Sequence, residues 1–201
     1  MRHIDFFDTI DTEEKAYWLG FVWADGNVRA DFRVLRINLS DIDVGHLKKF
    51  AALFNVKVRF SAKHKNSVTA YAAVNCKSLC MALVGKGVVP NKTEFDSAAP
   101  LDFVPHQLSH HFVRGFFDGD GCGSGVAVGF VGRHTFLSAL RELVAPAVGR
   151  GSLYEDGSVW RLKWNGARLK ERWFNYLYHD ATVYLERKRI VMLPRNCGAV
   201  T

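Results

Sequence analysis

The chain has 201 residues, of which 48% are hydrophobic and 13% aromatic, so it can bury a packed core and lacks the composition of a disordered tail. Lysine and arginine outnumber acidic residues by 27 to 20, and the net charge of +7 favours a polyanionic partner, either nucleic acid or an anionic membrane surface. No apolar run approaches the roughly 20 residues that span a bilayer, and Asp5 and Asp8 interrupt the apolar core that a signal peptide would need. We therefore expect no membrane partner and no secretion, but a location in the cytoplasm, at the nucleoid or in an organelle.

The first element that the sequence predicts is a helix beginning in the capping-box-like run DTEE, residues 11–14. Gly26 is its expected stop, directly after Asp25. A carboxylate at a helix C-terminus faces the negative end of the helix dipole, which typically costs ~0.3–1 kcal/mol. The residues at helical spacing are Ala16, Tyr17, Leu19, Gly20 and Trp23. The position of Asp25 therefore calls for another source of stabilisation.

Two hairpins and two further helices are predicted after this first helix. Residues 28–40 alternate polar and apolar side chains around a turn near Val34, which predicts a half-buried hairpin. A helix, a second hairpin and a final helix are expected over residues 43–54, 56–75 and 75–84. The polar face of the strands carries Arg29, Arg33, Arg36, Asn38, Lys57, Arg59 and Lys63.

The same order of elements returns after a linker at residues 93–106, which contains Pro100 and Pro105. A helix capped by Ser109 and ended by Gly121 is followed by expected strands at 122–131, a helix at 135–144, a hairpin at 152–164 and a helix at 165–178. The polar face of this hairpin carries Arg161, Lys163 and Asn165.

The sequence thus predicts three parts: an N-terminal repeat at residues 1–92, the linker at 93–106 and a C-terminal repeat at 107–201. Each repeat is αββαββα-like, and Asn75 and Asn165 are expected to cap the last helix of their repeats.

The two repeats share a motif, WLGFVWADG at residues 18–26 and VRGFFDGDG at residues 113–121. If the two motif helices pack side by side, Gly20 and Gly115 remove side chains at the contact and bring Asp25 and Asp120 together. Two carboxylates that close repel each other, and a bound cation would relieve the repulsion. Hard oxygen ligands of this kind suit Mg²⁺ better than zinc.

These two motifs resemble those of the LAGLIDADG homing endonucleases, in the single-chain form with two motifs. The resemblance implies an α+β fold of two pseudo-symmetric αββαββα repeats, packed through the motif helices, with antiparallel β-sheets that form a DNA-binding saddle. It also implies that Asp25 and Asp120 are metal-binding catalytic residues, assisted by the carbonyl groups of Ala24 and Gly119. Trp23 departs from the family pattern, because an acidic residue often stands at that position.

The second copy keeps an acidic residue at the position of Trp23, namely Asp118. Two residues from Asp120 is about 200° round a helix, so Asp118 should point away from the metal. We therefore expect a structural role for Asp118.

The activity implied by the resemblance is intron homing by site-specific hydrolysis of both DNA strands. The chain would act as a monomer with Mg²⁺ or Mn²⁺, and Ca²⁺ would support binding without cleavage. Lys92 and Lys188 lie at similar sequence distances beyond their aspartates and are candidate catalytic residues, as basic side chains that support the metal centre. Double-stranded DNA would lie on the polar strand faces, where arginine can read guanine and asparagine adenine. The first hairpin of the second repeat has only Cys122 and Ser124 as polar, non-glycine residues, so we expect this half to make fewer specific contacts to bases.

Three alternatives remain open from the residues. The chain could be an RNA maturase that binds intron RNA, or a DNA-binding protein of the same fold without cleavage; both aspartates are retained, which favours the nuclease. An intein is disfavoured, because no length is left for a splicing domain and Asn196 follows Arg195 rather than histidine.

Overall fold

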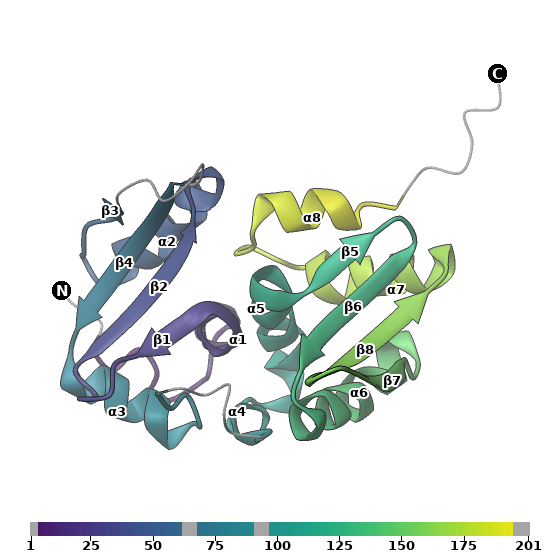
Figure 1. The fold of residues 1–201 in the computed structure, drawn as a ribbon, viewed down its shortest axis with the longest axis horizontal. Helices are drawn as coiled ribbons and strands as arrows, with labels where there is room; N and C mark the ends of the chain where they lie inside the picture. The colour runs from purple at the N-terminus through teal and green to yellow at the C-terminus, as the bar shows by residue number, and fades with distance from the viewer. Residues whose placement is uncertain (1–3, 62–67, 91–96, 195–201) are drawn as a thin grey trace.

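The computed structural model describes residues 4–61, 68–90 and 97–194, and places two halves of similar architecture side by side (Figure 1). Each half contains a four-stranded antiparallel sheet with helices packed against it. The α+β class and the internal repeat predicted from the sequence are therefore confirmed. Among the described residues, no helix has the length and apolar character needed to cross a membrane.

The first half follows the expected element order. Its elements are α1 (Glu13–Asp25), β1 (Gly26–Val28), β2 (Val34–Ser40), η1 (Asp41–Asp43), α2 (Val44–Leu53), β3 (Arg59–Phe60), β4 (Thr69–Asn75) and α3 (Lys77–Gly85). The strand order in the sheet is β1-β2-β4-β3, with every neighbouring pair antiparallel.

The second half repeats this order after two short helical segments, α4 (Ala99–Asp102), which lies in the predicted linker, and η3 (His106–Leu108), which begins at its last residue. Its elements are α5 (Ser109–Asp120), β5 (Cys122–Ser124), β6 (Ala127–Gly132), α6 (His134–Val148), β7 (Ser152–Asp156), β8 (Val159–Asn165), α7 (Ala167–Tyr178) and α8 (Glu186–Met192). The strand order β5-β6-β8-β7 matches that of the first sheet. The short helix α8 is an addition that the sequence pattern did not predict.

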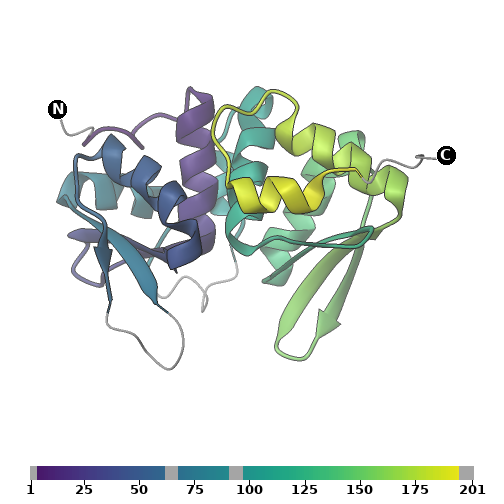
Figure 2. The same cartoon turned by 90° about the horizontal axis from the view of Figure 1, so that it is seen from above.

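The two halves join through α1 and α5, which lie side by side (Figure 2). A Cβ on Gly20 would lie 2.0 Å from the carbonyl oxygen of Phe112, and a Cβ on Gly115 would lie 1.9 Å from that of Tyr17. Only glycine allows backbones to approach this closely. The predicted role of both glycines in the helix contact is therefore confirmed.

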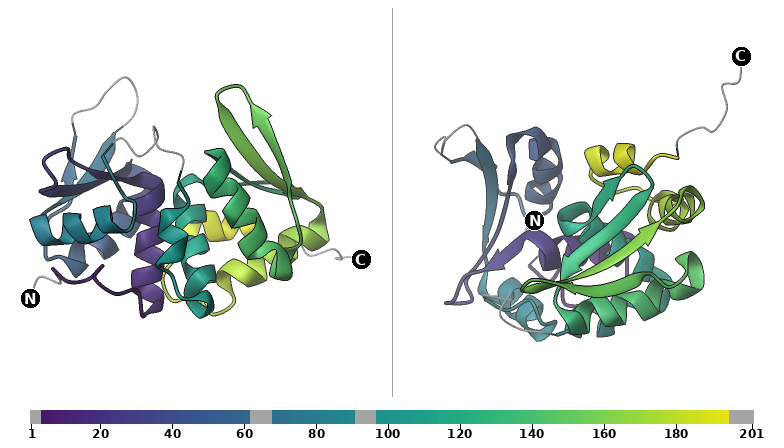
Figure 3. Two further views of the ribbon diagram at one scale, coloured as in Figure 1. Left: turned by 90° about the horizontal axis from the view of Figure 1, so that it is seen from below. Right: turned by 45° about the vertical axis from the view of Figure 1, so that its right-hand side comes forward.

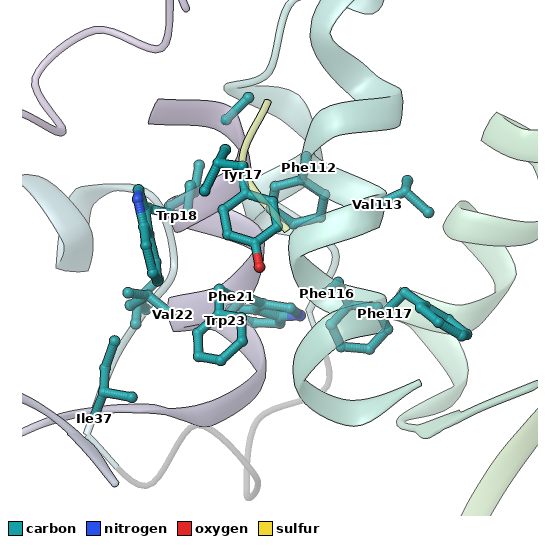
Figure 4. Packing of buried hydrophobic residues seen from close by; sticks show 14 of the residues in the cluster. Tyr17, Trp18, Phe21, Val22, Trp23, Ile37, Phe112, Val113, Phe116 and Phe117 are labelled. Atoms are coloured by element: carbon teal, nitrogen blue, oxygen red, sulfur yellow. The ribbon is translucent and has the colours of Figure 1, made fainter. Parts of the chain in front are cut away.

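Aromatic side chains from both helices fill the space around this contact (Figure 4). Tyr17 and Phe21 contribute from α1 and are fully buried. Trp23 from α1 and Phe116 from α5 both pack against Phe136 of α6, with ring centroids 5.4 and 4.7 Å apart respectively. Burial of so much aromatic surface makes the junction part of one continuous hydrophobic core.

The motif helices end at Gly26 and Gly121 as expected, but for a different reason. Both glycines have extended backbone, with φ of −76° and −69°, rather than the left-handed conformation of a common helix stop. A Cβ on Gly26 would lie 2.6 Å from the carbonyl oxygen of Val22, and one on Gly121 would lie 2.2 Å from the Phe117 ring. Glycine is needed at both positions because the chain turns there directly from a helix into a strand.

Three predicted helix caps are wrong. Ser109 is the first residue of α5, and Leu108 occupies its N-cap. Asn75 and Asn165 end β4 and β8 on their exposed faces, and the caps of the following helices are Cys76 and Gly166. Pairing within the sheets continues to both asparagines, and this outweighs their preference for capping.

The sheets extend to the same side of the α1–α5 pair, so that β4 and the β7–β8 hairpin form two arms (Figures 2 and 3). Their inner faces are buried against the helices through residues such as Leu35, Ile37 and Leu162. Their outer faces carry the alternating polar residues.

Candidate functional site

Asp25 and Asp120 lie at the ends of the two motif helices, which the glycine contacts hold together. The position that a Cβ on Gly119 would take lies 2.3 Å from the Ala24 Cβ and 3.2 Å from the Asp25 Oδ2 atom. The carboxylate of Asp25 therefore lies against the backbone of the other motif, one residue before Asp120. Asp25 is half-buried and Asp120 is exposed, so the two carboxylates differ in their access to water.

Lys188 approaches this pair from α8. Its Nζ atom donates a hydrogen bond to the carbonyl oxygen of Gly121, the residue that follows Asp120. Burial lowers the pKa of Lys188, and the neighbouring Arg187 adds to the decrease, whereas the negative charges of Asp118 and Asp25 oppose it. A half-buried cation thus lies within electrostatic range of Asp25. Lys92, its predicted counterpart, lies outside the described residues.

Arg187 adds a second positive charge beside Lys188. Its guanidinium forms an ion pair with the buried Asp43, with an Nη2 to Oδ2 distance of 2.8 Å. This hydrogen bond to Asp43 is the largest cause of its raised pKa, and Asp118 and Asp25 contribute to the same effect. The pair also ties α8 to the first half, since Asp43 directly precedes α2.

Asp118 is buried and connects the elements around the site through hydrogen bonds. It accepts hydrogen bonds from the hydroxyl groups of Tyr17 and Tyr178, at 2.8 and 2.7 Å, and from the backbone N–H of Leu185 at 2.7 Å. Burial raises its pKa to about 6, although these hydrogen bonds act in the opposite direction. Because Leu185 is the N-cap of α8, Asp118 links both motif helices to the helix that carries Lys188. This is the structural role expected from the sequence.

The outer face of the first sheet is polar. Arg36 and Asn38 are exposed on β2, and Arg36 donates to the Asn38 side-chain oxygen at 2.9 Å. The Arg36 guanidinium also lies over the Tyr71 ring of β4, 3.8 Å from its centroid. Arg59 of β3 pairs with Tyr71 from the other side. Asn27 of β1 pairs with Arg36 and is exposed, a further candidate that the sequence pattern missed.

Two predicted strand residues of this face lie in a loop instead. Arg29 and Arg33 belong to the connection between β1 and β2, in which Phe32 has a φ of 54° that excludes a continuous strand. Arg29 forms an ion pair with Asp31. Both arginines are exposed at the edge of the sheet. The alternation of charged and apolar residues there resembles a strand, but the chain turns.

Lys57 and Lys63 are not on a described strand either. Lys57 is exposed and precedes β3, and Lys63 lies outside the described residues.

The outer face of the second sheet differs in chemistry. Arg161, Lys163 and Asn165 are exposed on β8, as expected, and Arg161 is paired with Asp156 across the β7–β8 hairpin. The neighbouring strand β6 carries no such polar row. Its outward residues are Ala127, Gly129 and Val131, which pair with Asn165, Lys163 and Arg161.

A histidine cluster lies at the opposite end of α5 from Asp120. The Nε2 atom of His110 is 3.1 Å from the Asp180 Oδ2 atom, and that of His111 is 4.0 Å from it. Within the described parts of the chain, these three form the one group of at least three histidine, cysteine or acidic side chains close enough together to hold a metal ion. The two motif aspartates are not part of this cluster.

The fold is shared with solved homing endonucleases. The homing endonuclease I-WcaI bound to its DNA recognition sequence is similar with a TM-score of 0.66 at 10% sequence identity, over 93% of this chain and 88% of that chain. The LAGLIDADG meganuclease I-AabMI bound to uncleaved DNA is similar with a TM-score of 0.58 at 14% identity, over 87% of this chain and 86% of that chain. The chain therefore has the pseudo-symmetric LAGLIDADG fold.

Another solved structure with this fold is full-length DUF199/WhiA from Thermatoga maritima. It is similar with a TM-score of 0.57 at 15% identity, over 94% of this chain and 63% of that chain, so our chain spans less than two thirds of its length. Comparison with protein-family models found no match, and comparison with curated proteins found none. Identities this low show a common fold and leave activity to be argued from the site.

Proposed function

We propose that the protein is a site-specific endonuclease that hydrolyses both strands of double-stranded DNA with a divalent metal. One observation carries the proposal: Asp25 lies against Gly119, so the two motif carboxylates come from adjacent helix ends. A helix C-terminus disfavours negative charge, and here two such termini with carboxylates converge. This arrangement is expected where the chain must bind cations.

The donor set fits Mg²⁺, with Mn²⁺ as the alternative. The carboxylates of Asp25 and Asp120 and the carbonyl groups of Ala24 and Gly119 would hold it, and all four are hard oxygen ligands. Bound metal would polarise the scissile phosphate and lower the pKa of the attacking water. The chain itself supplies the negative charge, and the missing side chain at Gly119 gives the Asp25 carboxylate room.

Lys188 is proposed to stabilise negative charge at the scissile phosphate. Its hydrogen bond to the carbonyl group of Gly121 holds the ammonium group near Asp120, and its partial burial strengthens its interaction with an anion. Lys92 is proposed for the same role beside the other aspartate.

The sheet arms are proposed to bind the duplex. A β-ribbon fits the major groove, exposed polar side chains lie on β2 and β8, and the two sheets extend to the same side of the α1–α5 pair (Figure 3). The net charge of +7 adds affinity for phosphates. One chain supplies both arms, so we propose that a monomer binds one target.

The second candidate function is binding without cleavage, of DNA or of intron RNA as a maturase. Its support is that a similar fold occurs in full-length DUF199/WhiA as well as in the solved homing endonucleases. Retention of both motif aspartates favours cleavage.

A selection from randomised double-stranded DNA tests the proposal. The purified protein is incubated with the library in Mg²⁺, Ca²⁺ or EDTA, and both bound and cut molecules are sequenced. We expect a single target cut in Mg²⁺, and bound but uncut in Ca²⁺. Selection of a bound target with no cleavage in Mg²⁺ or Mn²⁺ would favour the second candidate, and cleavage in EDTA would contradict the metal mechanism.

A further inference from the structure

The two sheets present different chemistry at corresponding central strands. On the first sheet, β2 directs Arg36 and Asn38 outward. On the second sheet, β6 occupies the same place in the strand order and directs Ala127, Gly129 and Val131 outward. The pseudo-symmetric fold therefore carries hydrogen-bonding side chains on the central strand β2 of one sheet and small apolar side chains on the central strand β6 of the other.

The outer face of β6 forms the floor of a hollow of about 240 Å³. Cys122 and Ser124 border it on the β5 side, and Lys163, Arg161 and Tyr154 border it on the β8 and β7 side. Arg161 is held by its ion pair with Asp156 along this border. The hollow thus has an apolar floor and a polar, positively charged rim.

Gly129 lies at the centre of the floor. A Cβ there would be 3.2 Å from the Cys122 Sγ atom and 3.4 Å from the Leu162 carbonyl oxygen, so a larger side chain would crowd both neighbouring strands. Because Gly129 has no side chain, the surface between Ala127 and Val131 is formed by the backbone of β6. A bound surface can therefore approach the backbone of β6 closely.

We infer that this floor reads thymine, by apolar contact between β6 and the C5-methyl groups in the major groove of one half-site. The inference rests on the proposed DNA binding. Among the four bases, only thymine presents a methyl group in that groove. The outward side chains of β6 cannot donate to or accept from guanine or adenine, while the cationic rim can bind the flanking phosphates. The half-site under the first sheet is read instead by hydrogen bonds from Arg36 and Asn38.

Burial of one methyl group is expected to change affinity about fourfold. Replacing thymine with deoxyuridine removes only that methyl and keeps base pairing. Deoxyuridine at each contacted position should therefore weaken binding about fourfold in the half-site under the second sheet. The same replacement under the first sheet should leave affinity unchanged.

The experiment uses two randomised duplex libraries, one synthesised with thymine and one with deoxyuridine, selected for binding to the whole protein in Ca²⁺. Positions whose preference is relaxed by Arg36→Ala define the half-site of the first sheet. We expect the other half-site to show a preference for thymine that is lost in the deoxyuridine library, while the preferences of the first half-site persist.

The variant Val131→Thr provides the matched test on the protein side. It keeps the β-branched shape that suits a strand and replaces one methyl group of the floor with a hydroxyl. We expect it to reduce the thymine-over-deoxyuridine ratio at one position, and cooperative thermal unfolding of the purified variant shows independently that it is folded. Specific binding with equal selection from both libraries in both half-sites would overturn the inference alone. Absence of specific binding to either library would overturn the proposed function as well.

Discussion

Gly20 of α1 lies against Phe112 of α5 so closely that an added Cβ would be 2.0 Å from the Phe112 carbonyl oxygen. Because the atom that it would meet is backbone, the clash can be relieved only by moving the two helices apart. Gly20→Ala is therefore expected to destabilise the fold by about 3 kcal/mol or more, at the upper end for overpacked cores. Denaturant titration of the purified variant measures this change.

Gly45 provides the control. It lies within α2, and a Cβ there would meet no atom within 4 Å. Gly45→Ala should leave stability unchanged or raise it by up to about 1 kcal/mol, because alanine is the better helix former. Equal effects of the two substitutions would contradict the close helix contact.

Lys188→Gln is expected to slow cleavage about 10²-fold, the usual effect of losing one group that stabilises transition-state charge. DNA affinity should change little, because the sheets provide most of the contact. Single-turnover cleavage and binding in Ca²⁺ separate the two effects. Arg189→Gln is the matched control, since Arg189 lies on the same helix but over the Tyr184 ring. If both variants cleave at the wild-type rate, Lys188 has no part in the reaction.

Tyr71→Leu is expected to reproduce part of the effect of Arg36→Ala on DNA recognition. The Tyr71 ring supports the Arg36 guanidinium from below, so its loss leaves the arginine less well oriented for a guanine. Arg36→Ala should relax preference at one base position by about 1–3 kcal/mol. Selection profiles for each single variant and the double variant should show that Tyr71→Leu adds nothing once Arg36 is gone. Additive effects would mean that the two residues act on different bases.

The stability of the protein should fall below neutral pH because of two buried histidines. Burial lowers the pKa of His46 to about 3, assisted by Lys49 and opposed by Asp43. It lowers the pKa of His111 to about 4, assisted by Arg114 and His110 and opposed by Glu13 and Asp180. The unfolded chain binds these protons near pH 6.5 and the folded chain does not, so stability is present above pH 6.5 and is lost as the pH falls. Each histidine should cost about 2 kcal/mol at pH 5.

Asp118 acts in the opposite direction between pH 6 and pH 4. Its pKa is raised to about 6 by burial, so the folded state takes up this proton more readily than the unfolded state and gains stability as the pH falls. The test is the slope of the unfolding free energy between pH 7 and pH 5 for the wild type and for His46→Gln. The slope should decrease in the variant, whatever its stability at pH 7. An unchanged slope would show that His46 does not resist protonation.

Local patterns were sufficient to predict the motif helices, the exposed rows on β2 and β8, and the glycine contact. Each of these follows from side-chain periodicity or from a repeat that is visible along the chain. The Arg29–Arg33 segment shows the limit of periodicity, because five alternating residues fit a strand and a loop equally well.

The surroundings of Asp25 could not be predicted in the same way. Helix α8, which supplies Arg187 and Lys188, has only seven residues and is too short for a helical period to be recognised. Its position depends on the hydrogen bond from Leu185 to Asp118, a contact between residues far apart in sequence. Such contacts form only when the chain is folded, so local sequence patterns do not predict them.

Asp25 and Asp120 are proposed to form one metal-dependent cleavage site, and the two substitutions Asp25→Asn and Asp120→Asn test this most directly. Each removes a charge while keeping the size of the side chain. Folding stability should change by no more than about 1 kcal/mol, because loss of repulsion and of the unfavourable dipole contact is offset at Asp25 by loss of attraction to Arg187 and Lys188.

The measurement is cleavage and binding of the selected duplex by each variant, in Mg²⁺ and Ca²⁺ respectively. We expect each variant to bind as the wild type does and double-strand cleavage to fall by orders of magnitude, with slow nicking of one strand as the residual activity. Wild-type double-strand cleavage by either folded variant would contradict a shared site of the two aspartates.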